Sequence, residues 1–143
     1  MILIDVNLLL YATNSYASQH AAASEWLDRQ LSDEGRVGLP WVTLLSFLRM
    51  STNARIVTRA LSMTAAWQQV TQWLQREQVW IPQPAERHFE VLGNLLAQPG
   101  VHGNLVSDAH LAALAIEHGL TLCSTDGDFA RFRGLKWRDP LAR

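Results

Sequence analysis

The sequence predicts an α/β fold in which helices cover both faces of a small, mainly parallel sheet. Short apolar runs alternate along the chain with longer segments of helical periodicity, and this alternation is typical of βαβ units. The apolar fraction of 48% in 143 residues is enough for one sizeable core. No linker rich in Pro, Gly or Ser divides the chain, so we expect a single domain over residues 1–143.

Five short runs are the expected strands. The runs are short and mostly apolar, and each ends at or just before Pro or a polar residue, which is the pattern of a strand between two turns. The expected strands cover residues 2–6, 36–40, 79–81, 120–124 and 135–137.

The longer segments between these runs are the expected helices, because their apolar residues recur every three or four positions. Ser62 or Thr64 is a candidate N-cap for the third of them, and Gly119 is a typical stop for the last. The polar segment 51–62 is expected to be a connector. The expected helices cover residues 20–31, 41–50, 64–78, 85–98 and 108–119.

Composition narrows the functional classes. Twelve basic and thirteen acidic residues nearly cancel, so the chain lacks the strong overall positive charge of many nucleic-acid binders. The single Cys123 cannot form an internal disulfide, which fits a reducing compartment. No uncharged apolar run approaches about 18 residues, and Asp5 interrupts the first run. We therefore expect a cytoplasmic protein with no membrane segment and no signal peptide.

Four carboxylates fall where a parallel sheet places its active site. Asp5 lies near the end of the first expected strand, Asp108 begins the helix before the strand over 120–124, and Asp126 and Asp128 follow that strand. Sites in open parallel sheets form beyond the carboxyl ends of the strands. Clustered carboxylates repel one another unless a cation joins them, and Mg²⁺ prefers oxygen ligands. The sequence thus predicts a magnesium site at this edge.

Each of these residues can also have a purely structural role, without catalysis or metal binding. Asp108 can be a first-turn acid favoured by the helix dipole. The apolar stretch over residues 2–12 also reads as a strand that runs into a helix, and Asn7 can cap that helix. Asp126 and Asp128 can be turn residues, with Asp128 as a cap. Asp5 is the hardest to explain in this way, because a carboxylate within a buried strand needs a partner.

Two stretches resemble a known family. The stretches "MILIDVNLLLYA" at 1–12 and "SDAHLAALAIEHGLTLCSTDGDFARF" at 107–132, together with a length near 140, resemble PIN-domain ribonucleases, and more narrowly the VapC toxins of bacterial toxin–antitoxin modules. The resemblance implies a three-layer α/β/α sandwich with a five-stranded parallel sheet. It also implies Mg²⁺- or Mn²⁺-dependent cleavage of structured RNA, such as tRNA or rRNA, and neutralisation by a VapB-type antitoxin.

The resemblance assigns roles to individual residues. It implies that Asp5, Asp108 and Asp126 hold the metal, with Asp128 as an accessory acid. The family usually has a Glu on the helix after the second strand, and the matching residue here is Ser46. Two further sets complete the expected site. The residues expected to orient metal ligands and water are Asn7, Ser46, Ser124 and Thr125, and those expected to contact the RNA backbone are Arg49, Arg55 and Arg59.

A homodimer is also expected. The helices carry more aromatic residues, including Trp67 and Trp73, than one small sheet needs to cover it, and the family implies the same assembly.

Two rival functions remain. A degenerate PIN domain would bind antitoxin or RNA without cleaving it, which the missing Glu favours. A phosphoryl-transfer domain would need a buried Lys, and Lys136 is the only lysine in the chain.

Overall fold

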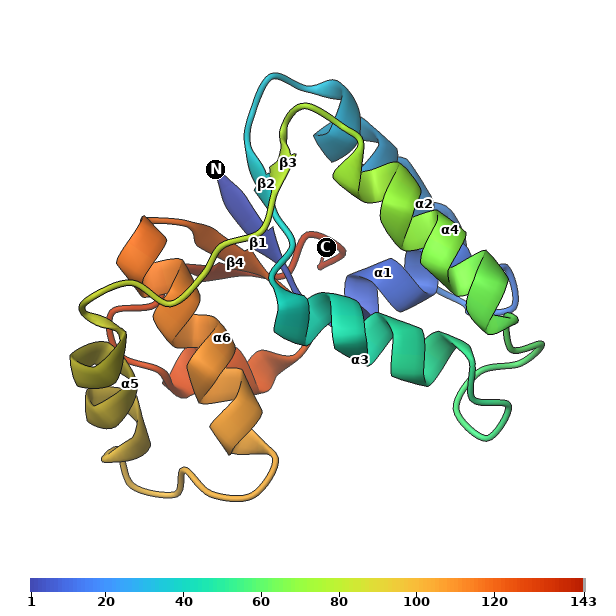
Figure 1. Cartoon of the computed structure of the whole chain (residues 1–143). Helices are drawn as coiled ribbons and strands as arrows, with labels where there is room; N and C mark the ends of the chain where they lie inside the picture. The colour runs from blue at the N-terminus through green and yellow to red at the C-terminus, as the bar shows by residue number, and fades with distance from the viewer. Residues whose placement is uncertain (143) are drawn as a thin grey trace.

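The structure, a computed structural model, describes residues 1–142 and is built on a sheet of five parallel strands (Figure 1). The strand order is β3-β2-β1-β4-β5, so β1 lies at the centre of the sheet. All four neighbouring pairs are parallel, which confirms the α/β fold expected from the sequence. The strands are β1 (Ile2–Ile4), β2 (Val37–Gly38), β3 (Val79–Trp80), β4 (Thr121–Cys123) and β5 (Trp137–Arg138).

Helices cover both faces of this sheet. Helices α5 and α6 lie on one side, and α1 to α4 lie on the other (Figure 1). No helix within residues 1–142 is long and apolar enough to cross a membrane. The helices are α1 (Val6–Thr13), α2 (His20–Ser32), α3 (Trp41–Ser51), α4 (Met63–Leu74), α5 (His88–Leu96), α6 (Leu105–His118) and the 3₁₀ helix η1 (Gly127–Arg131).

The two faces of the sheet belong to two separate hydrophobic cores. In β1, Ile2 and Ile4 pack under α1 to α4, whereas Leu3 packs under α5 and α6. Side chains alternate across a strand, so a strand buried on both faces is apolar at every position. Phe47 and Trp73 meet edge to face in the first core, with ring centroids 4.8 Å apart. This sandwich of two helical layers around β1 is the three-layer arrangement that the resemblance implies.

All five strands are shorter than expected, and the last begins at Trp137 rather than at residue 135. In the first strand this changes the role of Asp5. The strand ends at Ile4, and Asp5 is the N-cap of α1, accepting a hydrogen bond from Val6 N at 2.8 Å. The prediction of a strand over residues 2–6, with Asp5 inside it, is therefore wrong. The alternative of Asn7 as the cap is also wrong, because the Asp5 side chain accepts from an N–H in the first turn.

Three helices differ from their predicted ranges by three residues or more. Helix α5 begins at His88 rather than at residue 85, and it ends at Leu96 rather than at residue 98. Helix α4 ends at Leu74 rather than at residue 78, because Val79 has to be extended to pair with Val37 of β2. Helix α6 begins at Leu105, so Asp108 lies in its first turn and not at its start. The caps are as expected: Ser62 accepts from Ala65 N, and Gly119 ends α6 with a left-handed φ of 66°.

Candidate active site

Asp5 is held rigidly where β1 and β4 end side by side. Its backbone N–H donates to the carbonyl of Cys123 at 3.0 Å, which extends the β1–β4 pairing by one residue. Its Oδ1 accepts from Val6 N at 2.8 Å, and its Oδ2 accepts from the hydroxyl of Ser124 at 2.8 Å. Asp5 therefore presents its carboxylate in one orientation.

Ser124 is the residue that connects this part of the site. It is fully buried, and its single hydroxyl proton goes to Asp5. The same oxygen accepts from Asn7 Nδ2 at 3.2 Å and from the backbone N–H of Asp126 at 3.0 Å. Ser124 thereby ties Asp5 and α1 to the loop after β4.

The loop after β4 places the remaining two acids. Asp126 Oδ1 accepts from the backbone N–H of Asp128 at 2.9 Å, so Asp126 caps η1. The alternative in which Asp128 is the cap is wrong. Asp128 is exposed and its Oδ1 lies 3.7 Å from the guanidinium of Arg131. Thr125 is half-buried on the same loop.

Electrostatics show that the four carboxylates are close enough to affect one another. The pKa of Asp108 is raised to about 6, first by burial and then by Asp5, Asp126 and Asp128, against an opposing effect of Arg131. Burial also raises the pKa of Asp5, with a smaller contribution from Asp126. The hydrogen bonds from Ser124 and from the backbone N–H of Val6 act in the opposite direction. The fold thus gathers four acids from distant parts of the sequence at a cost in charge repulsion.

A cleft of about 90 Å³ opens between α1, α3 and α6 beside these acids. Ser46 lies in this cleft with Asp5 and Asp108, as expected if it occupies the family's Glu position. Sequence reasoning missed Thr43, whose hydroxyl donates to the carbonyl of Ile4 at 3.1 Å. Its position one helical turn before Ser46 could have identified it. The lining residues are Asp5, Val6, Val42, Thr43, Ser46, Ser107, Asp108 and Leu111.

The donor set fits a hydrated magnesium ion better than a metal enclosed by side chains. Within residues 1–142, no group of three or more His, Cys, Asp or Glu side chains is arranged to hold a metal ion together. The Oδ1 atom of Asn7 is buried beside Ser124 and has no hydrogen-bond partner there. Mg²⁺ prefers such oxygens, and it commonly binds one or two carboxylates while water and phosphate complete its shell. The residues of the cleft therefore suit Mg²⁺.

The structure does not bring the predicted arginines into the cleft. Arg49 lies in the last turn of α3, and Arg55 and Arg59 lie in the loop that follows, all three exposed. Asp5, in contrast, lies by the N-terminal end of α3, since Thr43 of α3 bonds to the carbonyl of Ile4. Any contact of these arginines with RNA would therefore be made outside the acidic cleft.

Comparison with known proteins identifies the family. The family model for the PIN domain matches residues 2–135. The chain belongs to the PIN-domain family. It is 43% identical over 142 residues to Ribonuclease VapC37 of Mycobacterium tuberculosis, with 99% of each chain covered. It is 40% identical to Ribonuclease VapC43 of the same organism, covering 99% of this chain and 96% of the relative. Within the PIN domains, its relatives over the full length are thus VapC ribonucleases.

Solved structures give the same fold at lower identity. VapBC2 from Rickettsia felis, bound to a DNA fragment from its promoter, superposes with a TM-score of 0.68 at 20% identity, covering 96% of this chain and 98% of the other. Mycobacterium tuberculosis VapC20, described as a toxin that cleaves the sarcin–ricin loop, superposes with a TM-score of 0.67 at 20% identity, covering 95% and 99%. These PIN domains share the three-layer arrangement.

Proposed function

We propose that this PIN domain is a metal-dependent endoribonuclease, the toxin of a toxin–antitoxin pair, that cleaves structured RNA and is neutralised by a VapB-type antitoxin. The observation that carries the proposal is the meeting of these acids at one sheet edge: Asp5 and Asp108 line one cleft, and the Ser124 hydroxyl joins Asp5 to the backbone of Asp126. A fold retains mutually repelling carboxylates at the carboxyl ends of its strands where they serve chemistry. Full-length similarity to proteins named VapC ribonucleases supports the same activity.

In this proposal Asp5, Asp108 and Asp126 share Mg²⁺ or Mn²⁺, with one or two carboxylates bound to the ion directly and the rest through its bound water. The bound ion would polarise the scissile phosphate and lower the pKa of an attacking water. The protein's own part is to position the ligands. Ser124 fixes the Asp5 carboxylate by its hydrogen bond, and Asp108, with its pKa of about 6, is mostly ionised at neutral pH.

A degenerate domain that binds RNA or antitoxin without cutting is the second candidate. Ser46 stands in the cleft at the position where the family has a Glu, and a hydroxyl brings no negative charge. Asp128 can supply a further carboxylate only from an exposed position on η1, where Arg131 lies close to it. If Asp128 does not compensate, cation binding is too weak for turnover.

The acidic cleft also indicates how an antitoxin would bind. An uncompensated cluster of acids is a suitable site for a cationic side chain, so we propose that the antitoxin inserts an Arg that pairs with these carboxylates in place of the metal. Structural neighbours include complexes described as VapBC, from Rickettsia felis and from Salmonella typhimurium.

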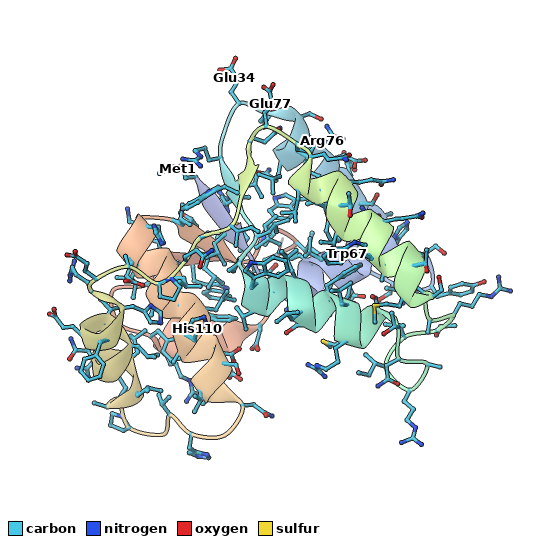
Figure 2. All side chains as sticks on the ribbon, in the orientation of Figure 1. Met1, Glu34, Trp67, Arg76, Glu77 and His110 are labelled. Atoms are coloured by element: carbon cyan, nitrogen blue, oxygen red, sulfur yellow. The ribbon has the colours of Figure 1, made fainter. Side chains whose placement is uncertain are left out.

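We also propose a homodimer, but only one of the two tryptophans named in the sequence analysis supports it. Trp73 is buried against Phe47, so the part of the expectation that used it as a surface residue is wrong. Trp67 remains 49% exposed on α4 (Figure 2), and it is the aromatic residue on that helix that a second copy can cover.

Growth and cleavage assays test the activity. Expression of the wild-type chain alone should arrest growth, and Asp5→Asn or Asp126→Asn should relieve the arrest, because Asn keeps the shape of Asp but removes the charge that holds the cation. The exposed Asp28 on α2, outside the cleft, gives the matched control Asp28→Asn, which should arrest growth like the wild type. Purified protein should cleave total RNA with MgCl₂ and not with EDTA. Arrest that persists in both site variants would favour the binding-only domain.

A further inference from the structure

A second cavity lies at the opposite end of α1 and α3 from the carboxylates. It has a volume of about 270 Å³ and shares no lining residue with the acidic cleft. Its walls come from the end of α1, the loop after α1, the end of α3 and the 52–62 loop, which meet on the right in Figure 1. The apolar part of the wall is formed by Leu10, Val57 and Leu61.

One polar group in this cavity has no partner. Ser51, the last residue of α3, lines the cavity and is only 3% exposed. Its hydroxyl is buried, and none of the described residues forms a hydrogen bond with it. A buried hydroxyl without a partner is unfavourable, so such a group in a cavity is suited to a ligand that brings its own donor or acceptor.

The rim of the cavity carries a cation stacked on an aromatic ring. The Arg59 guanidinium lies 5.2 Å from the ring centroid of Tyr16, and both residues line the cavity. Arg59 holds a left-handed φ of 56°, a strained conformation for a residue other than Gly. None of the described lining residues is acidic. The rim therefore favours a ligand that carries an anionic group.

We propose that this cavity takes one unstacked base of the RNA substrate, an inference that rests on the proposed function. The base would pack on Leu10, Val57 and Leu61, and its polar edge would bond to the Ser51 hydroxyl. Arg59 would contact the adjoining phosphate. Proteins commonly read RNA through bases that are splayed out of single-stranded loops and hydrogen-bonded on their edges. Drug-sized ligands need pockets of about 300–1,000 Å³, so a slightly smaller cavity suits a single base.

The cavity lies within reach of an RNA strand bound at the acids. Helix α1 has eight residues and starts directly after Asp5, so its far end is about 12 Å away at about 1.5 Å per residue. The base in the cavity would thus lie a few nucleotides from the scissile phosphate. It would set the preference for the base at that one position.

Titration with mononucleotides tests the cavity without any need for cleavage. The methyl NMR signals of Leu10, Val57 and Leu61 are followed in EDTA while AMP, GMP, CMP or UMP is added, with ribose 5-phosphate as the control for phosphate alone. We expect saturable shifts with at least one of the four nucleotides and none with ribose 5-phosphate. Ser51→Ala should weaken that binding about fivefold to tenfold, the effect of losing one hydrogen bond. Ser51→Leu, which fills the cavity, should abolish it.

Controls separate a binding role of Ser51 from a structural one. Ser51→Ala removes an unpaired hydroxyl, so it should melt no lower than the wild type. The exposed Ser18 provides the control Ser18→Ala, which should bind like the wild type. In cleavage of a randomised RNA library, Ser51→Ala should reduce the base preference at one position about fivefold to tenfold and leave the other positions unchanged.

Three results would overturn the inference. The first is the absence of methyl shifts with all four nucleotides, and the second is equal shifts with ribose 5-phosphate. The third is a Ser51→Leu variant that loses antitoxin binding while its base preference is intact, because the cavity would then hold an antitoxin side chain. A chain that binds nucleotides here yet cleaves no RNA would refute the proposed nuclease function alone.

Discussion

Replacing Asp108 with Asn should stabilise the metal-free protein while it abolishes activity. The pKa of Asp108 is raised from 3.8 to about 6 by burial and by three neighbouring carboxylates, so the fold opposes its ionisation. At about 1.36 kcal/mol for each tenfold change in the ionisation equilibrium, this shift corresponds to about 3 kcal/mol. The side chain is partly exposed, and solvent screening reduces the expected gain in unfolding free energy to about 1–2 kcal/mol at pH 7.5.

The pH dependence of this stability difference tests whether the ionisation of Asp108 causes it. Below pH 3.8 the carboxyl is protonated in both the folded and the unfolded chain, so Asp108→Asn and the wild type should be nearly equal in stability. As the pH rises from 3.8 to about 6, the unfolded chain loses its proton first, and the wild type loses stability relative to the variant. Above pH 6 the difference should stay constant.

Urea unfolding in EDTA at pH 4 and pH 7.5 measures this difference, with Asp28→Asn as the control for a lost surface charge. Added MgCl₂ should then stabilise the wild type by about 2.7 kcal/mol at a hundredfold excess over its dissociation constant, and should stabilise Asp108→Asn far less. The reasoning is refuted if Asp108→Asn is no more stable than the control at pH 7.5, or if its advantage is the same at both pH values.

Three further predictions concern the cleft and the surface. Ser46→Glu should tighten Mg²⁺ binding about tenfold or more by restoring a carboxylate beside Asp5 and Asp108. Calorimetry that shows unchanged affinity would mean that a carboxylate at position 46 does not contribute to metal binding. Ser124→Ala should lower activity about 10–100-fold and the unfolding free energy by about 1–3 kcal/mol, because the Asp5 carboxylate loses its donor; wild-type kinetics would exclude this positioning role. Trp67→Glu should convert a dimer into a monomer in sedimentation, whereas a wild-type chain that is already monomeric at tens of micromolar would disprove the dimer.

The sequence alone predicted the fold class, the strand and helix segments and the edge at which the acids collect. These features depend on local patterns: apolar periodicity, turn residues and the rule that parallel sheets place their sites at the carboxyl ends of strands. The boundary at Asp5 was missed because the apolar run continues from β1 into α1, so periodicity does not show where the strand ends. Cap geometry shows it only once the Asp5 side chain is seen to accept from Val6 N.

Contacts between distant segments were decided by the tertiary structure. Ser124 donates to Asp5 from 119 positions away, and no local pattern relates the two residues. Between α5 and α6, His88 Nδ1 lies 2.5 Å from Glu117 Oε2, and His88 Nε2 lies 3.1 Å from Nδ1 of His110, which Figure 2 labels on α6. The spacing of the five histidines in the sequence gave no sign of this cluster.

The burial of individual side chains was also decided by the tertiary structure and not by the local sequence pattern. Periodicity places Trp67 and Trp73 on α4 without indicating that Trp73 packs on Phe47 while Trp67 is exposed. It also cannot show that the Ser51 hydroxyl has no partner. A sequence determines which residues share a face of one element, because that depends on the repeat of the backbone. Which faces meet, and which polar atoms find partners there, depends on how all the elements pack together, and that packing determines both the acidic cleft and the cavity beside Ser51.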